Sequence, residues 1–266
     1  MLPLRELPAG TLANIRGVFF DIDDTLTTDG CLTAAAYGAL ELLKAHGLLA
    51  VPVTGRPAGW CDHIARMWPV DGVVGENGAF WFAHDHAAKK MTQRFIADAA
   101  TRAERRERMR EIGERILSAV PGTAWASDQH YREADIAIDF CEDVPALPRA
   151  EVERIAALMR EAGLTAKISS IHVNGWFGEY DKLSTTRLFM RERFGIELDS
   201  AKERYLFIGD SPNDAPMFAW FPNAIGVANI RELAGLVPHW PAYVTEGRSG
   251  AGFEEVVNAL IGARSR

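Results

Sequence analysis

The sequence has few cysteines and no surplus of basic residues. Its three cysteines, Cys31, Cys61 and Cys141, are far apart and form no Cys-x-x-Cys pair. This odd, scattered set argues against a disulfide framework and gives no zinc pattern. Reduced thiols in a cytoplasm are the simpler interpretation. A formal net charge of −7 weighs against a nucleic-acid binder, although a bound cation could still attract an anionic substrate.

Long apolar segments are also missing. No run approaches the roughly 18 apolar residues that span a membrane. Residues 1–16 contain no unbroken apolar core of the kind found in signal peptides. We therefore expect a cytoplasmic protein that binds neither a membrane nor nucleic acid. The chain still has ample apolar material for a large core, because 48% of its residues are hydrophobic.

The hydrophobic pattern predicts alternating strands and helices at both ends of the chain. Helices are predicted at residues 34–46, 58–68 and 182–194. Short apolar runs typical of buried strands lie at residues 17–20, 48–53, 72–74, 205–208, 224–227 and 242–244. Strands that alternate with helices predict a doubly wound, parallel α/β sheet.

The middle third follows a different pattern. A long helix is predicted over residues 92–120 and a second over 150–161, with alternating, strand-like segments at 134–140 and 165–173. We therefore predict an α+β unit inserted into the α/β core. The prediction places the insert at residues 85–176 and the core at 1–84 and 177–266.

The strongest chemical signal is the acidic segment Asp21-Ile22-Asp23-Asp24-Thr25. It directly follows a predicted strand, and open α/β sheets bind their ligands outside the carboxyl ends of strands. Three acids at one such point repel one another, and a divalent cation with oxygen ligands would compensate. Taken alone, the segment could equally be an acidic turn that caps the next helix.

Three other segments are expected near the same edge of the sheet. Thr54-Gly55-Arg56 ends the second strand, where a hydroxyl and a glycine amide can hold phosphate oxygens. Gly209-Asp210-Ser211-Pro212-Asn213-Asp214 ends a later strand and brings further carboxylates. Lys182 opens a helix near the return to the core. Each has an ordinary alternative: a strand-to-helix turn, a helix N-cap, and a solvent-exposed lysine.

Together and in this order, the four segments resemble the motifs of the haloacid dehalogenase (HAD) superfamily. The acidic segment resembles motif I and Thr54-Gly55-Arg56 motif II. Lys182 resembles motif III, and the segment from Gly209 to Asp214 resembles motif IV. The resemblance implies a HAD-like doubly wound parallel sheet with an inserted α+β cap.

The position of the insert between motifs II and III resembles one branch of that superfamily. The branch has a large α/β cap and includes Cof-like sugar phosphatases, sucrose-phosphate and mannosyl-phosphoglycerate phosphatases, and phosphomannomutases. Glu76-Asn77-Gly78-Ala79 is similar to a segment common in Cof-like members. Many members have glycine at the position of Asp24. Aspartate tolerates left-handed backbone conformations better than most residues, so we expect the turn to keep its shape.

The resemblance implies roles in phosphoryl transfer. Asp21 would attack phosphorus and form an aspartyl phosphate. Asp23 would protonate the leaving alcohol and then activate water. Thr54, the Gly55 amide and Lys182 would bind the phosphoryl group.

The resemblance also implies a magnesium ion. Its ligands would be the Asp21 carboxylate, the Asp23 backbone carbonyl and Asp210. Asn213 and Asp214 would lie at the edge of this metal site and orient its ligands.

We expect the insert to act as a mobile lid that selects the substrate. His172, Asn174 and Trp176 lie close to the return to the core, and their donors, acceptor and aromatic face suit sugar hydroxyls and rings. Arg56 is a further candidate for contact with the substrate. The alternative is that the insert residues simply build the cap sheet.

These expectations predict magnesium-dependent hydrolysis of a small-molecule phosphate monoester, in particular a sugar or sugar-acid phosphate. Two alternatives stay open. A phosphomutase would use the same residues and return the phosphoryl group to the sugar. A catalytically idle binding protein would keep the fold and bind without turnover.

Overall fold

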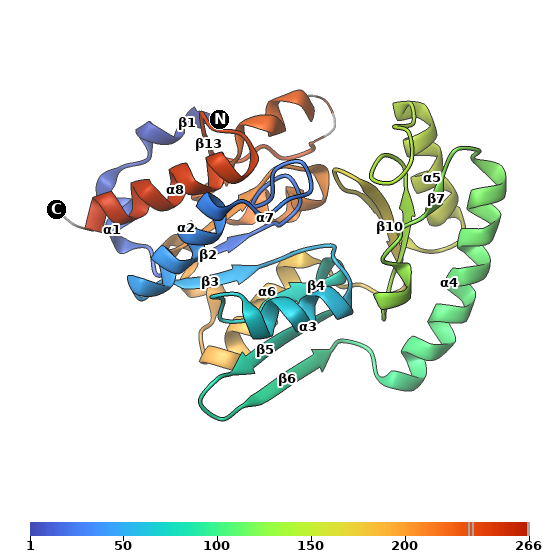
Figure 1. Cartoon of the computed structure of the whole chain (residues 1–266), viewed down its shortest axis with the longest axis horizontal. Coiled ribbons are helices and arrows are strands. Elements are labelled where there is room, and N and C mark those ends of the chain that lie inside the picture. Colours follow the sequence, from blue (N-terminus) through green and yellow to red (C-terminus); the bar gives the residue numbers. More distant parts are fainter. Residues whose placement is uncertain (234, 236, 265–266) are drawn as a thin grey trace.

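The computed structural model describes residues 1–233, 235 and 237–264. Two α/β units lie side by side in it, a larger one that holds both ends of the chain and a smaller one formed by the middle of the sequence (Figure 1). The larger unit is built on a six-stranded sheet whose neighbouring strands are all parallel. In spatial order the strands are β1 (Leu2–Pro3), β13 (Tyr243–Val244), β12 (Ala224–Gly226), β11 (Tyr205–Gly209), β2 (Gly17–Phe20) and β3 (Leu49–Pro52).

Helices cover both faces of this sheet. All four residues of β2 are buried; Val18 and Phe20 belong to one hydrophobic cluster and Phe19 to another. The first cluster includes side chains of α2 (Ala34–Ala45) and α8 (Ser249–Arg264), with α1 (Ala9–Asn14) beside them. The second includes side chains of α6 (Lys182–Phe194) and α7 (Ala215–Trp220). A continuous apolar strand buried on two sides is typical of a doubly wound sheet, so this prediction is confirmed.

An antiparallel group extends the core. It contains β4 (Val73–Gly75), β5 (Phe80–Asp85) and β6 (Lys90–Phe95), and α3 (Ala58–Met67) packs against it. A single parallel bridge between Val53 and Val74 joins the group to the end of β3. The boundary predicted at residue 85 cuts the β5–β6 hairpin, because Asp85 pairs with Lys90. We therefore propose that the insert begins after β6.

We call residues 99–176 the cap. Its antiparallel sheet has the order β7 (Ala124–Trp125), β8 (Ile136–Asp139), β10 (His172–Trp176) and β9 (Thr165–Ile168). Helices α4 (Ala99–Ala119) and α5 (Arg149–Glu161) bury Met109, Ile116 and Ile155 in the hydrophobic core of the cap. The expectation of one helix from residue 92 is wrong at its start. Residues 90–95 pair with β5, and α4 begins after its N-cap Asp98, which accepts a hydrogen bond from the Thr101 amide at 2.8 Å.

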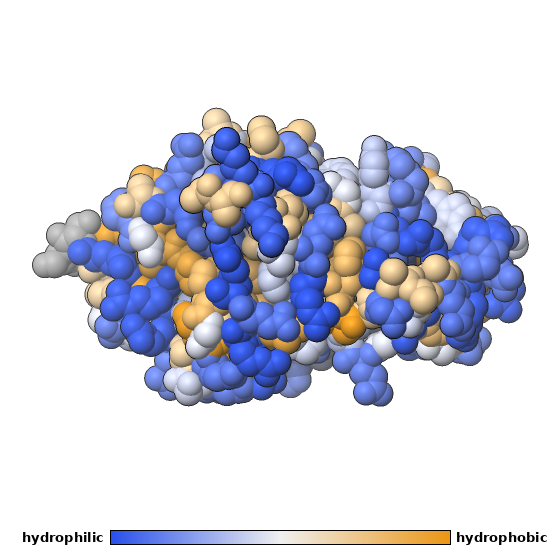
Figure 2. All heavy atoms as spheres, turned by 90° about the horizontal axis from the view of Figure 1, so that it is seen from below, coloured by the Kyte–Doolittle hydropathy of each residue, from blue (hydrophilic) through white to orange (hydrophobic). Residues whose placement is uncertain are grey.

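Short 3₁₀ helices complete the connections, at Leu4–Glu6, Glu76–Gly78, Gln129–Tyr131, Leu198–Ser200, Lys202–Arg204, Pro212–Asp214 and Ala228–Leu233. None of the described helices combines the length and the apolar content needed to cross a bilayer. In Figure 2 the face seen from below is mostly hydrophilic, with apolar side chains in separate patches. The predicted site residues are instead mostly buried, where core and cap meet.

Candidate active site

The motif residues meet at the carboxyl edge of the parallel sheet. Asp21 directly follows β2, and its amide donates to the Ile208 carbonyl of the neighbouring strand β11 at 2.9 Å. Thr54 follows β3 on the other side of β2, and Asp210 follows β11. Because β2 lies between β3 and β11, these three loops lie next to one another.

Lys182 is the buried cation of this edge. Its Nζ lies 2.9 Å from Asp21 Oδ1 and 2.7 Å from Asp214 Oδ1, and the residue is only 1% exposed. Burial acts to lower the pKa of Lys182, but the two carboxylates outweigh it and raise that pKa above its ordinary value. A capping box between Asp181 and Ser184 fixes the start of α6 and so the position of the lysine. The alternative of a solvent-exposed lysine is wrong.

Asp214 supports the site with both carboxylate oxygens. Oδ1 accepts a hydrogen bond from Lys182, and Oδ2 accepts from the amides of Asp210 and Ser211 at 3.1 and 3.3 Å. A Cβ at Gly209 would lie 2.4 Å from Asp214 Oδ2, so only glycine fits there. These bonds fix the loop that carries Asp210.

The acidic cluster fits a divalent cation. Asp21, Asp210 and Asp214 each place a carboxylate oxygen within 4.8 Å of the others. Burial, together with repulsion from neighbouring carboxylates, raises the pKa of Asp21 to about 7 and that of Asp210 well above its usual range. From the described residues the Asp210 carboxylate accepts only long, neutral hydrogen bonds, from Thr25 Oγ1 at 3.2 Å and Asn229 Nδ2 at 3.3 Å. Two such carboxylates suit a hard cation such as Mg²⁺.

Asn229 is a supporting residue that the sequence motifs do not contain. Its Nδ2 also donates to the Asp24 carbonyl at 3.0 Å, and its Oδ1 accepts from the Ser249 amide at 2.9 Å. Asp24 itself has φ of 55°, which confirms the expected left-handed turn. No local pattern marks Asn229, because its partners come from distant segments.

An anion pocket adjoins the cluster. In the described part of the chain, no group accepts a hydrogen bond from the amides of Ile22, Asp23 or Gly55. The Thr54 hydroxyl oxygen accepts from the Arg56 amide at 3.0 Å, which leaves its proton for another acceptor. Converging amides and a hydroxyl beside a buried lysine can hold the oxygens of a phosphoryl group.

Arg56 joins the core to the cap. Its guanidinium donates to Asp23 in the core, to Glu142 in the cap at 2.7 Å, and to Asp128 in the cap at 3.3 Å. All three guanidinium nitrogens of this predicted substrate residue thus donate to protein carboxylates. Glu142 and Asp128 were not found from the sequence, because pairing over such long separations leaves no local signal.

The three cap residues predicted to contact substrate have different surroundings. His172 Nε2 lies 2.9 Å from Oε2 of Glu142, and the same Glu142 accepts a hydrogen bond from Arg56. Asn174 donates to Asp135 Oδ2 at 3.0 Å and lies next to Gly55. Trp176 is 1% exposed and belongs to a hydrophobic cluster that joins core and cap, so the structure gives no support for a substrate contact there. This side chain stabilises the junction instead.

Further bonds attach the cap to the core. The buried Glu76 carboxylate accepts from the amide of Ala58 at 2.9 Å and from the cap amides of Glu133 and Ala134 at 2.9 and 2.6 Å. Arg132 of the cap donates to the Gly55 carbonyl at 2.9 Å. The cap therefore lies against the Thr54–Arg56 loop, and its motion as a lid stays a prediction.

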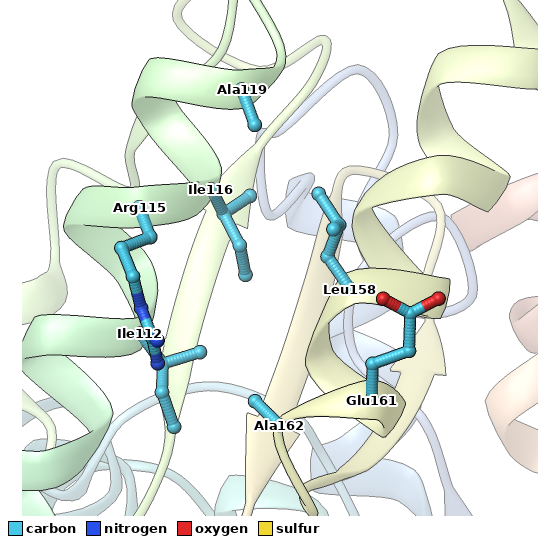
Figure 3. Close-up of a pocket in the computed structure, with 7 residues that line it drawn as sticks. All are labelled: Ile112, Arg115, Ile116, Ala119, Leu158, Glu161 and Ala162. Carbon is cyan, nitrogen blue, oxygen red and sulfur yellow. The ribbon is translucent and has the colours of Figure 1, made fainter.

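A separate groove lies in the cap, away from these residues. It has a volume of about 300 Å³ and runs between α4 and α5, as Figure 3 shows. Ile112, Ile116 and Leu158 form much of its wall, and Arg115 and Glu161 are its charged residues. The groove contains none of the predicted site residues.

Comparison with known proteins supports the fold. No protein-family model matches the sequence, and no curated protein matches it either. Among solved structures, sucrose-phosphatase from Synechocystis sp., in complex with sucrose and phosphate, has 16% identity and a TM-score of 0.62, over 93% of this chain and 98% of that one. The C-terminal domain of trehalose-6-phosphate phosphatase from C. albicans has 14% identity and a TM-score of 0.69, over 98% and 99%.

A third solved structure is a HAD subclass IIB sugar phosphatase with 15% identity and a TM-score of 0.61, over 93% of this chain and 99% of that one. At such low identities the likeness concerns the fold. It extends over nearly the whole length of each protein, cap included. The chain therefore has the fold of the cap-bearing phosphatases of the HAD superfamily.

Proposed function

We propose that this protein hydrolyses phosphate monoesters of small polyhydroxylated molecules, such as sugars or sugar acids, with Asp21 as the nucleophile. One observation carries the proposal: Lys182 is buried between Asp21 and Asp214 at the sheet edge, next to backbone amides that have no acceptor among the described residues. A buried carboxylate, a buried cation and free donors at one point suit attack on a phosphoryl group. The sugar class is supported by the sucrose-, trehalose- and sugar-phosphate names of proteins with this fold.

The first step transfers the phosphoryl group to the protein. Asp21 forms a bond to phosphorus as the ester P–O bond breaks, and Asp23 gives its proton to the leaving alcohol. Lys182 offsets the repulsion between the Asp21 carboxylate and the phosphate. Thr54 and the Gly55 amide hold the phosphoryl oxygens.

The second step returns the group to water. Asp23 takes a proton from water, which attacks phosphorus and releases inorganic phosphate and free Asp21. The cap excludes other water while the intermediate exists.

Magnesium is part of the proposal. Asp21, the Asp23 carbonyl and Asp210 would hold the ion, and Asp214 would keep its bonds to Lys182 and to the loop amides. When bound, Mg²⁺ supplies positive charge that reduces the repulsion between carboxylate and phosphate. We also propose a cytoplasmic location, which the free cysteines support, with Cys61 buried in the core.

A phosphate-release screen tests the function. Wild-type protein, Asp21→Asn and the exposed control Asp199→Asn are incubated with hexose, disaccharide and sugar-acid monophosphates and with p-nitrophenyl phosphate. We expect release by the wild type and the control, and loss of at least about 10⁴-fold in kcat for Asp21→Asn with an unchanged circular-dichroism spectrum. Comparable release by Asp21→Asn, or no release from any ester by the wild type, overturns the proposal.

A further inference from the structure

Two asparagine amides, one from the core and one from the cap, face the same point beside Gly55. A Cβ at position 55 would lie 3.2 Å from Asn77 Nδ2 and 3.7 Å from Asn174 Oδ1. Both asparagines are 2% exposed. A donor and an acceptor thus converge on the point that a side chain at position 55 would occupy.

The orientation of the Asn77 amide is fixed by a chain of hydrogen bonds. The Ser211 hydroxyl donates to Asn213 Oδ1 at 2.6 Å, so Asn213 presents its Nδ2 to Asn77. That Nδ2 donates to Asn77 Oδ1 at 3.3 Å, which turns Asn77 Nδ2 toward Gly55. Within the described residues Asn77 Nδ2 is buried and has no acceptor. Asn213, predicted at the edge of the metal site, therefore also orients a second amide.

The Asn174 amide is fixed by an ion pair in the cap. Its Nδ2 donates to Asp135 Oδ2 at 3.0 Å, and Asp135 is held by Arg132 at 3.0 Å. A flipped amide would place two acceptors against each other, so Oδ1 is the atom that faces Gly55. No described group donates a hydrogen bond to this oxygen.

We propose that Asn77 and Asn174 together recognise a hydroxyl group of the alcohol part of the substrate, an inference that rests on the phosphatase function proposed above. A hydroxyl accepts from Asn77 Nδ2 and donates to Asn174 Oδ1 at the same time. A phosphoryl oxygen only accepts, so it would leave Asn174 unsatisfied and repel its carbonyl. An ammonium group only donates and fails at Asn77. The substrate class is therefore a polyol or sugar phosphate with a hydroxyl close to the ester.

The pair also explains how the cap would select substrates. An ester without the hydroxyl leaves the buried Asn77 donor unpaired, and an alcohol that pairs with it avoids that cost. Asn174 belongs to the cap strand β10 and lies beside Gly55 of the core. The hydroxyl can therefore contact Asn174 only while β10 lies against the Thr54–Arg56 loop. Neither asparagine touches the reacting atoms, so both are specificity residues.

The test compares substrates and variants. The substrates are the sugar phosphate with the highest activity in the screen, its monodeoxy forms and p-nitrophenyl phosphate. The proteins are the wild type, Asn77→Gly, Asn174→Ala, the double variant and the exposed control Asn258→Ala. Glycine at position 77 keeps the left-handed backbone, where φ is 53°. Asn77→Asp, which also tolerates that backbone, replaces the donor by an acceptor. Melting temperatures show that each variant is folded.

We expect each single variant to lose about tenfold in kcat/KM on the sugar phosphate and less than about threefold on p-nitrophenyl phosphate. One monodeoxy form should show the same loss with the wild type. Because one hydroxyl contacts both amides, the double variant should lose little more than either single variant. Equal losses on both substrates, additive losses, or no effect of any deoxy form overturns the inference. Activity of the wild type on p-nitrophenyl phosphate, abolished by Asp21→Asn, shows that the proposed function stands in that case.

Discussion

Two nitrogens of the Arg56 guanidinium donate hydrogen bonds to the Asp23 carboxylate. Nε lies 2.9 Å from Oδ1 and 3.0 Å from Oδ2, and Nη2 lies 2.8 Å from Oδ1. Because the same guanidinium donates to Glu142 and Asp128 of the cap, the Asp23 carboxylate is held at the side of the site that faces the cap. This position suits a group that exchanges a proton with the leaving alcohol.

Replacing Asp23 by asparagine should separate proton transfer from phosphoryl transfer. On an alkyl phosphate we expect kcat to fall by about 10² to 10⁴, because the leaving alkoxide then receives no proton. The loss should be much smaller for the first step with p-nitrophenyl phosphate, whose leaving group needs little protonation. Single-turnover kinetics on both esters measure the rate of phosphoryl transfer to Asp21 directly. Equal losses on the two esters would mean that Asp23 acts only by positioning.

Removal of the metal should abolish turnover. We expect no phosphate release after dialysis against EDTA and full recovery with Mg²⁺, because the carboxylates of Asp21 and Asp210 otherwise repel the phosphate. Asp210→Ala should need a higher Mg²⁺ concentration for half-maximal activity, whereas the exposed control Asp199→Ala should not. Activity that survives EDTA would contradict the proposed metal site.

The products of the same reaction separate a phosphatase from a phosphomutase. A phosphatase releases free sugar and inorganic phosphate without any bisphosphate activator. Isomerised sugar phosphate that forms only with a bisphosphate would indicate the mutase. Chromatography of the sugar products distinguishes the two.

Glu142 should make the stability of the protein sensitive to acid. Burial acts to raise the pKa of Glu142, but hydrogen bonds from His172 and Arg56 outweigh it and lower that pKa from 4.5 to about 2. The folded state therefore binds this proton less readily than the unfolded state. The stabilisation is present above pH 4.5 and is lost as the pH falls toward 2.

The Glu142→Gln variant tests this contribution. We expect it to lower the free energy of unfolding at pH 7 by about 1 to 2 kcal/mol, a figure reduced for the partial exposure of the side chain. Its stability should change less between pH 4.5 and pH 3 than that of the wild type. Urea unfolding at these pH values measures both effects, with the exposed Glu153→Gln as control. A parallel pH profile for wild type and variant would show that Glu142 does not contribute in this way.

The sequence predicted the core well because its signals are local. An apolar strand followed by acids, as at Asp21, or a glycine-rich turn after a strand, as at Gly55, depends on residues a few positions apart. The parallel sheet then brings these turns to one edge. The position of Lys182 could be predicted from local signals too, because the residue begins the helix that returns the chain to the core.

The junction between core and cap could not be predicted in this way. Asp128 lies 72 residues and Glu142 86 residues after Arg56 in the sequence. No local pattern near any of the three indicates its partner. Strand β6 was missed because its residues are mostly polar and exposed, so its hydrophobic pattern was weak. By type, Trp176 fits a sugar ring and a hydrophobic cluster equally well. Only the folded structure favours the cluster, because the ring lies among apolar side chains and its Nε1 donates to the Tyr180 carbonyl.

The Glu76 carboxylate has a consequence for how such a protein could diversify. Its side chain belongs to the core, yet two of its three backbone partners belong to the cap. A cap transplanted from another protein onto this core would have to offer two amides at the positions of Glu133 and Ala134, or leave the buried Glu76 carboxyl group short of hydrogen-bond partners. Exchange of caps as modules is therefore constrained by the hydrogen bonds of a core residue. Recombination should succeed most readily when residue 76 is inherited together with the cap.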